Sequence, residues 1–430
     1  ISSTATRIGV ADSRRPCVYS PEVTRVATPP QQPRAERGAL GQSRINLGAA
    51  LRAGSDRTVA ALYAITLLLV GFGLIMVLSS SSITSYVADQ GFFGGFWRQA
   101  TFAIVGLPLM LLAAAMPVAF WKRWAWMLLG VGILLQLLVF TPLGVEVYGN
   151  RNWIQIGGFG AQPSEALKLA LVVWIGAVRL MTVPVPGQVR REIIPVVVPG
   201  AVFGLGLVLL GRDLGTVLIM AALVLGAMYF GGISWQSLGV VAFGGLLAVV
   251  FFVVTSPNRM ARLFGHAAGN DDYSGLGWQP LHGLWALAGG GLFGVGLGGS
   301  RANWSRLPAA DNDYIFAIIG EELGLIGALL VVALFIALAA VLLRVIARAR
   351  DRFGKAVVGG ILVWIVGQAF VNIGVVIGVL PVLGVPLPLI SAGGTALIAC
   401  LLAMGVVISI ARDGANYQAE LEAEHGRTAR

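Results

Sequence analysis

Residues 59–80 read VAALYAITLLLVGFGLIMVLSS, a run of 22 residues without a charged side chain. A helix of about 20 apolar residues crosses the roughly 30 Å hydrocarbon layer of a bilayer. Similar runs recur along the chain, which is 57% hydrophobic and only 12% charged, whereas about 25% of the residues in a soluble globular protein are charged. The sequence therefore predicts a polytopic membrane protein.

Ten apolar segments of this kind are predicted to span the membrane. They lie at residues 59–80, 98–116, 124–143, 163–182, 193–210, 214–232, 235–255, 313–345, 356–381 and 387–411. The predicted fold class is all-α, with ten transmembrane helices. Only Gly211-Arg212-Asp213 separates the fifth span from the sixth, and losing that break would reverse the orientation of everything that follows.

Basic residues gather in short segments that alternate with the spans. The stretch before residue 59 holds nine arginines against four acids, and the other basic segments follow spans two, four, eight and ten. Their residues are Lys122, Arg123, Arg190, Arg191, Arg344, Arg348, Arg350, Arg352, Lys355 and Arg412. Because cytoplasmic loops carry the excess of Lys and Arg, both termini are predicted to be cytoplasmic. This placement accounts for the net charge of +10 without nucleic acid as a partner.

The chain is predicted to have one membrane domain with a tail at each end. Residues 1–58 contain scattered prolines and arginines and few clustered apolar residues, so we expect a disordered cytoplasmic tail. The membrane domain covers residues 59–411, and residues 412–430 form a cytoplasmic C-terminal tail. Cys17 and Cys400 lie in the first tail and the last span, so no structural disulfide is expected.

Residues 256–312 form a predicted extracytoplasmic loop of 57 residues between spans seven and eight. Connections longer than about 15 residues are uncommon and are usually functional or disordered. The apolar stretch Leu281–Leu292 is too short to span, which favours a re-entrant or interfacial helix. The following string Gly289–Ser300 has a GxGxxG-like spacing, but without a βαβ context a dinucleotide site is excluded.

Asp313 stands where this loop meets span eight. From spacing alone two interpretations stay open: a helix N-cap, which Asp favours, or a general base whose pKa is raised by partial burial. Glu321 and Glu322 follow about two turns later. Two adjacent acids in an apolar run cannot both face lipid, so at least one is expected to meet a polar partner in the protein interior or a substrate.

Further polar residues surround the start of span four. Glu165 and Lys168 are three residues apart on one helix face and can form an ion pair. Arg151, on an external side that is otherwise poor in basic residues, is suited to phosphate or carboxylate. Asp213 fits a tight turn as well as a functional site. Ser391-Ala392-Gly393-Gly394-Thr395 interrupts span ten, which membrane proteins tolerate where backbone lines a cavity or is buried in protein.

Taken in order, several strings resemble the SEDS family (shape, elongation, division, sporulation) over roughly residues 59–411. They are Arg151 and Trp153 with Gln162-Pro163-Ser164-Glu165 and Lys168; Asp213-Leu214-Gly215-Thr216; Gly294-Val295-Gly296-Leu297-Gly298; Asn312-Asp313-Tyr314-Ile315-Phe316-Ala317 with Glu321-Glu322-Leu323-Gly324; and Asn372-Ile373-Gly374 leading to Leu387-Pro388-Leu389-Ile390-Ser391-Ala392-Gly393-Gly394. The segment Ile318–Gly324 looks more like the division branch than the elongation branch. Ser391–Gly394 and the arginine-rich tail look like division members from actinobacteria.

SEDS proteins are ten-span enzymes that polymerise peptidoglycan glycan strands from lipid II. The resemblance therefore implies a glycosyltransferase of the bacterial plasma membrane, acting at the division septum with an extracytoplasmic active site. It implies that Asp313 is the catalytic aspartate. It also implies a class B penicillin-binding protein transpeptidase as partner, beside other division proteins and membrane lipids. The family often has Gln-Pro where Gly211-Arg212 stand here and Gln-Ser near Leu281 and His282, so neither pair is given a specific role.

In the mechanism that the resemblance implies, Asp313 deprotonates the 4-hydroxyl of the acceptor strand, which attacks the anomeric carbon of a lipid-linked donor. Undecaprenyl diphosphate leaves and needs cationic stabilisation. The substrate-binding candidates are Arg151, Trp153, Glu165, Lys168, Arg259, Arg262, Glu321, Glu322 and Ser391. Asp213, Gly393 and Gly394 are given structural or orienting roles. The sequence establishes no cofactor; a divalent cation is an option, although no ligand cluster demands one.

Two other classes of function stay open. Ten spans, intramembrane carboxylates and broken helices also suit a flippase or transporter for lipid-linked precursors, although no clear inverted repeat is present. A non-catalytic scaffold of the division machinery is the second alternative, but it would not require an aspartate at position 313.

Overall fold

The computed structural model describes residues 57–87, 89, 91–147, 150–157, 159–181, 189–255, 278–300 and 311–428. The predicted disordered tail lies outside these ranges except for its last two residues, where the first helix begins. Much of the predicted loop 256–312 also lies outside them, and with it Arg259 and Arg262.

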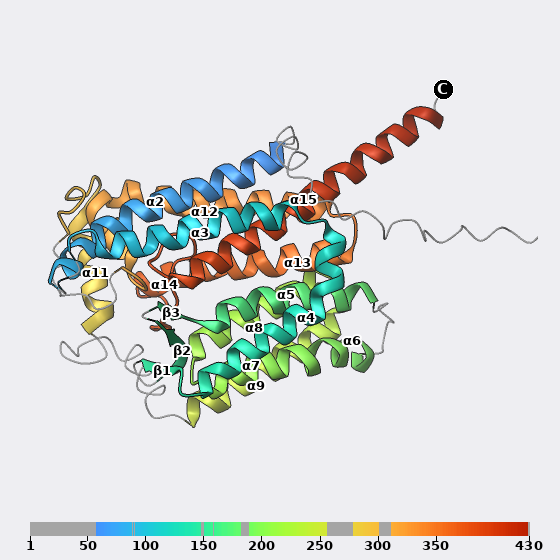
Figure 1. The fold of residues 1–430 in the computed structure, drawn as a ribbon, viewed down its shortest axis with the longest axis horizontal. Helices are drawn as coiled ribbons and strands as arrows, with labels where there is room; N and C mark the ends of the chain where they lie inside the picture. Colours follow the sequence, from blue (N-terminus) through green and yellow to red (C-terminus); the bar gives the residue numbers. More distant parts are fainter. Residues whose placement is uncertain are drawn as a thin grey trace, which may run out of the picture. The chain divides into compact units, whose positions relative to one another are not determined.

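The described residues form mostly helices, with one small antiparallel sheet (Figure 1). In chain order the helices are α2 (Arg57–Val87), α3 (Gly94–Ala115), α4 (Val118–Leu137), α5 (Pro163–Met181), α6 (Val189–Val196), α7 (Phe203–Leu210), α8 (Leu214–Phe230), α9 (Trp235–Val254), α11 (Trp278–Gly290), α12 (Ile315–Arg348), α13 (Arg352–Leu362), α14 (Gln368–Val376) and α15 (Thr395–Thr428). A 3₁₀ turn at Leu138–Phe140 follows α4, and π-helical turns at Val197–Val202 and Val363–Gly367 join α6 to α7 and α13 to α14.

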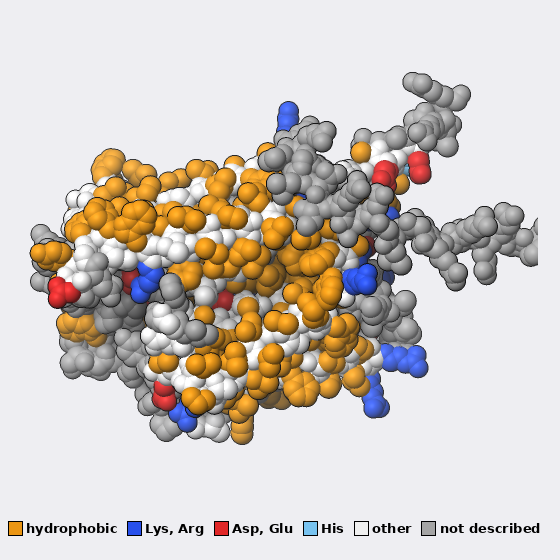
Figure 2. Space-filling view, in the orientation of Figure 1, with side chains coloured by type: hydrophobic (Ala, Val, Ile, Leu, Met, Phe, Trp, Pro, Cys, Tyr) orange, Lys and Arg blue, Asp and Glu red, His pale blue; other side chains and the backbone are white. Residues whose placement is uncertain are grey.

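Eight helical segments within the described ranges are long and apolar enough to cross a membrane. Large apolar side chains cover much of the outside of these helices, and most charged side chains lie toward the two ends in Figure 2. Leu68, Phe243 and Phe251 are each more than half exposed. Surface apolar patches of this extent mark contact with lipid or protein. The prediction of a helical polytopic membrane protein is confirmed.

The predicted fourth and sixth spans correspond to α5 and α8, which are not among these eight segments. Helix α8 has only 17 residues. Helix α5 has 19 residues, but they include Glu165, Lys168 and Arg179, all of which are buried. Both helices lie mainly in the interior of the protein and form less of its lipid-facing surface.

In the described part of the chain, side chains cap the starts of three helices. Asp213 caps α8 by accepting a hydrogen bond from the N–H of Thr216, and Ser234 caps α9 in the same way through Ser237. Asp351 caps α13. Asp and Ser are favoured at this position because their side-chain oxygens accept one of the N–H groups that a helix start leaves unpaired. These caps fix the ends of the short connections between spans.

The last helix differs from its prediction. It begins at Thr395 and not at residue 387, and it continues beyond residue 411 to Thr428. The residues before it include Leu389 and Gly394, whose φ angles are 66° and 49°. Left-handed backbone of this kind ends a helix, so residues 387–394 form an irregular segment at the head of α15.

Helix α12 is broken at Gly324, whose backbone has φ 68° and ψ −164°. The glycine-rich segment 291–298 pairs with the broken turn. The N–H groups of Val295 and Gly296 donate to the carbonyls of Glu321 and Glu322, each at 3.0 Å, and the N–H of Leu325 donates to the carbonyl of Gly291 at 2.9 Å. Backbone groups exposed by a broken helix in lipid need such partners, which gives this glycine-rich string a structural purpose.

The sheet was not predicted. Strands β1 (Gly144–Val147), β2 (Asn150–Ile156) and β3 (Phe159–Ala161) pair in the order β1-β2-β3 between α4 and α5. Two of them are shorter than the usual five or six residues and give little periodic signal. The N–H of Arg151 in β2 donates to the carbonyl of Gly211 at 2.9 Å, so the sheet lies against the start of α8.

Helices α5 to α9 run back and forth between two common ends. At one end lie the sheet, the start of α5 and the cap of α8. At the other end, Arg179 of α5 donates to the carbonyl of Gly232 beyond α8 at 3.2 Å, and Glu192 of α6 accepts a 2.6 Å bond from Ser234 before α9. Figure 1 shows these helices side by side.

Candidate functional site

Asp313 lies in the turn Asp311–Tyr314, directly before α12. It is not the N-cap of that helix: Tyr314 occupies the cap position, and no side chain caps there. Asp313 is half-buried, its Oδ1 atom is shielded from solvent, and within the described ranges this oxygen has no hydrogen-bond partner. Of the two interpretations left open by spacing, the N-cap is therefore wrong.

The surroundings of Asp313 disfavour its charged form. Burial raises the pKa of Asp313 to about 7, and the negative charges of Asp213 and Asp311 act in the same direction. Burial also raises the pKa of Asp311, against the positive charge of Arg98. A carboxyl group with a pKa near neutrality can exchange a proton under physiological conditions.

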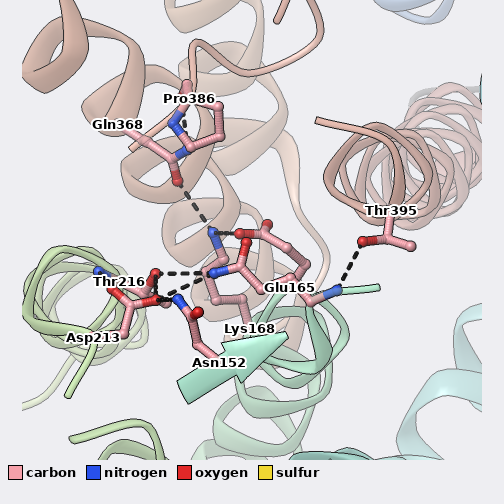
Figure 3. A network of polar contacts seen from close by, with 9 residues as sticks. Asn152, Glu165, Lys168, Asp213, Thr216, Gln368, Pro386 and Thr395 are labelled. Atoms are coloured by element: carbon pink, nitrogen blue, oxygen red, sulfur yellow. Dashed lines mark hydrogen bonds and ion pairs between the residues drawn. The ribbon is translucent and has the colours of Figure 1, made fainter. Parts of the chain in front are cut away.

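Asp213 has the opposite surroundings, since donors saturate its carboxylate (Figure 3). Its Oδ2 accepts hydrogen bonds from Asn152 at 2.6 Å, Thr216 at 2.7 Å and Gln162 at 3.2 Å. Its Oδ1 accepts the N–H of Thr216 at 3.0 Å. Asp213 thus ties the sheet and the start of α5 to the head of α8, in line with the structural or orienting role that was predicted for it.

Glu165 and Lys168 form the ion pair that their spacing predicted, at 2.8 Å, with both side chains at most 3% exposed. The Lys168 ammonium also donates to Gln368 at 3.2 Å and lies 4.9 Å from the ring centre of Trp364. Gln368 in turn donates to the carbonyl of Pro386 at 2.8 Å (Figure 3). The pair is enclosed by α5, α14 and the segment before α15, and its contact with substrate stays a prediction.

Arg151 and Trp153 both lie on β2. The Arg151 guanidinium donates to the carbonyl of Thr141 at 2.9 Å, and Trp153 pairs with Val145 across the sheet. The turn beside them explains one departure from the family pattern. A side chain at Gly211 would lie 2.5 Å from the carbonyl oxygen of Arg151, and Arg212 has a φ of 67°, which proline cannot adopt.

Glu321 and Glu322 meet polar partners inside the protein. Glu321 accepts a short hydrogen bond from Ser300. Glu322 accepts one from Ser79 of α2 at 2.6 Å, and the same Ser79 oxygen accepts the N–H of Gly298 at 2.9 Å. The two acids therefore connect the glycine-rich segment to α2 and α12, which is the interior hydrogen bonding that was one of their two predicted uses.

The predicted substrate ligand Ser391 is also used within the fold. Its hydroxyl donates to the carbonyl of Asn312 at 2.6 Å and accepts the N–H of Leu387 at 2.8 Å. Gly394 has a φ of 49° and donates its N–H to Gln99 at 3.3 Å, while Gly393 donates to the carbonyl of Ser391 at 2.7 Å. These residues hold the irregular segment beside the Asp313 turn.

Leu281 and His282, the second departure from the family pattern, lie on α11. The His282 ring lies between those of Trp278 and Trp285, with ring centres 3.9 and 4.9 Å away. The surroundings of His282 are thus those of an aromatic cluster on the predicted extracytoplasmic loop.

Four residues in or beside the turn were not among the predicted site residues: Arg98, Gln99, Asp311 and Asn372. Asn372 donates to the carbonyl of Asp313 at 2.7 Å, and Gln99 donates to the carbonyl of Ser391 at 2.9 Å. A polar residue within an apolar span was the available signal for Gln99 and Asn372. In the ranges that the structure describes, no three His, Cys, Asp or Glu side chains are grouped as a metal ion would require.

Residues 60–416 match the family model for FtsW, RodA and SpoVE, described as cell cycle proteins. The probable peptidoglycan glycosyltransferase FtsW of Mycobacterium tuberculosis is 38% identical over 354 residues, covering 81% of this chain and 67% of that protein. The stage V sporulation protein E of Bacillus subtilis is 36% identical over 351 residues, covering 81% and 95%.

Solved structures agree. A chain from a peptidoglycan synthase complex, in work on the structural coordination of polymerization and crosslinking, has a TM-score of 0.66 and 25% identity, covering 82% of this chain and 97% of that one. The rod shape determining protein RodA of Thermus thermophilus has a TM-score of 0.60 and 25% identity, covering 82% and 96%. The motifs from residue 151 to residue 394 predicted this relationship under the name SEDS. The chain belongs to the FtsW/RodA/SpoVE family of cell cycle proteins.

Proposed function

We propose that this chain polymerises lipid II into peptidoglycan glycan strands, releases undecaprenyl diphosphate, and uses Asp313 as its general base. The enzyme class, peptidoglycan glycosyltransferase, is the one for which its FtsW relatives are named. The observation that carries the proposal concerns the Asp313 carboxyl group. It is half-buried, and one of its oxygens accepts no hydrogen bond from a described residue.

The chemistry needs a base that is deprotonated at working pH and still basic enough to take a proton from a hydroxyl group. A pKa of about 7 meets both conditions. In the proposed step, the carboxylate of Asp313 accepts the proton of the acceptor 4-hydroxyl. The acceptor oxygen forms a bond to the anomeric carbon of the donor, and the bond from that carbon to the diphosphate oxygen breaks.

The departing diphosphate needs positive charge near the reacting carbon. Among the described residues, the candidates are Arg151, which the sequence predicted, and Arg98, which the structure adds. Arg98 is exposed and its charge acts on Asp311 in the Asp313 turn, and Arg151 lies on the sheet beside α8. Lys168 is less suited because its charge is already paired with Glu165. Arg259 and Arg262 stay predictions.

We also propose ten membrane crossings, with both termini in the cytoplasm and Asp313 on the extracytoplasmic side. Helices α5 and α8 connect the same two ends as α6–α7 and α9, which have the length and composition of crossings. The basic segments that follow spans two, four and eight then share one side. A role at the division septum is supported by the FtsW relatives and by the motif forms at Ile318–Gly324 and Ser391–Gly394.

A transpeptidase of the class B penicillin-binding type is the proposed partner. The support is the similarity to a chain from a complex that couples polymerization and crosslinking. Both substrates carry long lipid tails, so the reaction is proposed to occur where the extracytoplasmic end of the helices meets the bilayer.

The experiment is a strand-elongation assay with labelled lipid II and purified protein reconstituted in vesicles, with and without the partner. Asp313→Asn should abolish polymerisation, because an amide cannot accept the proton, while expression and lipid II binding persist. Asp351→Asn is the matched control: it makes the same exchange at the cap of α13, where Asn also caps well, and should keep normal activity.

Full activity of Asp313→Asn would exclude this aspartate as the base. A wild-type protein that moves lipid II across the vesicle membrane without extending any strand would favour a flippase. Strand elongation that depends only on the partner's own active site would favour a scaffold.

A further inference from the structure

Hydrogen bonds to its backbone carbonyl groups hold the turn that carries Asp313. Three successive carbonyl oxygens accept hydrogen bonds: that of Asp311 from the N–H of Ala392 at 3.0 Å, that of Asn312 from the hydroxyl of Ser391 at 2.6 Å, and that of Asp313 from the amide of Asn372 at 2.7 Å. All three donors come from α14 and the segment before α15, far along the chain.

The two side-chain donors are themselves fixed. Asn372 is 1% exposed, and its Nδ2 atom also donates to the carbonyl of Val385 at 2.8 Å. Ser391 is 4% exposed, and its hydroxyl accepts the N–H of Leu387 while it donates to Asn312. Each side chain thus joins the Asp313 turn to residues 385–391, so the turn and this segment form one braced unit.

A base that must leave an oxygen free for its substrate cannot be oriented through hydrogen bonds to that oxygen. Oδ1 of Asp313 has no hydrogen-bond partner among the described residues. The orientation of the carboxyl group therefore has to come from the backbone that carries it. The three carbonyl bonds supply that restraint.

We propose that Asn372 and Ser391 are positioning residues that hold the backbone of Asp313 so that its carboxylate meets the acceptor hydroxyl. This inference rests on the proposed role of Asp313 as general base. It gives Ser391 a different function from the substrate contact that its motif suggested, since neither side chain needs to touch the substrate. A misplacement of about 1 Å in a reacting group can lower a rate by about 100-fold.

The test compares Ser391→Ala, Asn372→Leu and Ser391→Thr with Ser409→Ala in the lipid II assay. Ser409 is the matched control: it is also 4% exposed, and its hydroxyl donates to the carbonyl of Met116 at 2.7 Å, away from the Asp313 turn. Ser391→Ala and Asn372→Leu should lower kcat by about 10- to 100-fold with little change in KM. Ser391→Thr keeps the hydroxyl and should recover most of kcat, and Ser409→Ala should keep normal kcat.

Three results would overturn the proposal: a kcat within threefold of wild type for both Ser391→Ala and Asn372→Leu, a rise in KM at unchanged kcat, or a loss in Ser409→Ala equal to that in Ser391→Ala. Ser391→Ala removes two hydrogen bonds, with Asn312 and Leu387, and Ser409→Ala removes one, with Met116. Melting temperatures measured in detergent separate misfolding from misplacement. The proposed role of Asp313 as general base is tested separately by Asp313→Asn, which keeps all three hydrogen bonds to the carbonyl groups of the turn. An inactive Asp313→Asn beside fully active Ser391→Ala and Asn372→Leu would overturn the positioning role alone.

Discussion

Asp213 and Asp313 are the same kind of residue in opposite surroundings. Four hydrogen bonds satisfy the Asp213 carboxylate. Asp313 has a shielded oxygen without a partner in the described ranges, and burial raises its pKa to about 7. Neighbouring carboxyl groups with such different surroundings often divide structural and proton-transfer roles between them.

This contrast predicts how polymerisation depends on pH. Asp313 acts only when deprotonated, so activity should rise with pH, reach half of its maximum near pH 7 and fall about tenfold per unit well below that. Asp213→Asn removes one of the negative charges that raise the pKa of Asp313, so its midpoint should move to lower pH. Initial rates in reconstituted vesicles from pH 5 to pH 9 measure both. A flat profile down to pH 5 would contradict the prediction.

The motif in the sequence made Asp313 the candidate base, but the sequence did not reveal the residues that bind the Asp313 turn. Asn372 and Ser391 lie 59 and 79 positions away from the residues that they bind, and Asn152 lies 61 positions from Asp213. Sequence spacing carries information about residues three or four apart on a helix, which is why the Glu165–Lys168 pair was predicted. Contacts between distant helices depend on packing, which spacing does not encode.

At the scale of elements, apolar length predicted the helices well, whereas irregular segments were harder. The helix at the tenth span starts eight residues later than predicted, at Thr395, because Leu389 and Gly394 have left-handed backbone. The glycine-rich string after α11 was recognised as a motif, but no structural role was predicted for it. Its use is to pair with the break in α12 at Gly324, about three turns after Asp313.

The crossing of α11 and α12 gives a prediction with an internal control. A Cβ at Gly290 would lie 1.9 Å from the carbonyl oxygen of Gly320 on α12, whereas a Cβ at Gly289 would meet no atom within 4 Å. Gly290→Ala should therefore destabilise the protein by about 1–3 kcal/mol through overpacking. Gly289→Ala should be neutral, or stabilising by up to about 1 kcal/mol. Thermal unfolding in detergent compares the two, and equal melting temperatures would show that α11 does not pack on α12 in this way.

At the scale of the whole molecule, polar contacts gather at the two ends of helices α5–α9. The sheet, the Asp213 cap and the start of α5 lie at one end of α5–α9, and the Arg179, Glu192 and Ser234 contacts lie at the other. Hydropathy and the distribution of basic residues predicted this alternation, but they could not show that charged residues of α5 face inward. The buried Glu165–Lys168 pair explains how a segment with three charged residues can still lie within the membrane domain.

The number of crossings can be decided by labelling single cysteines with a membrane-impermeant maleimide, in a background of Cys17→Ser and Cys400→Ser. Glu146, Arg190 and Thr255 are exposed and lie before α5, at the start of α6 and after α9. If α5 and α8 both cross, Glu146→Cys and Thr255→Cys should react on intact cells stripped of their wall, and Arg190→Cys only after permeabilisation. Labelling of Glu146→Cys and Arg190→Cys from one side would mean that α5 does not cross. Labelling of Thr255→Cys from the side of Arg190→Cys would mean the same for α8, because α6–α7 and α9 would then account for both crossings between these positions.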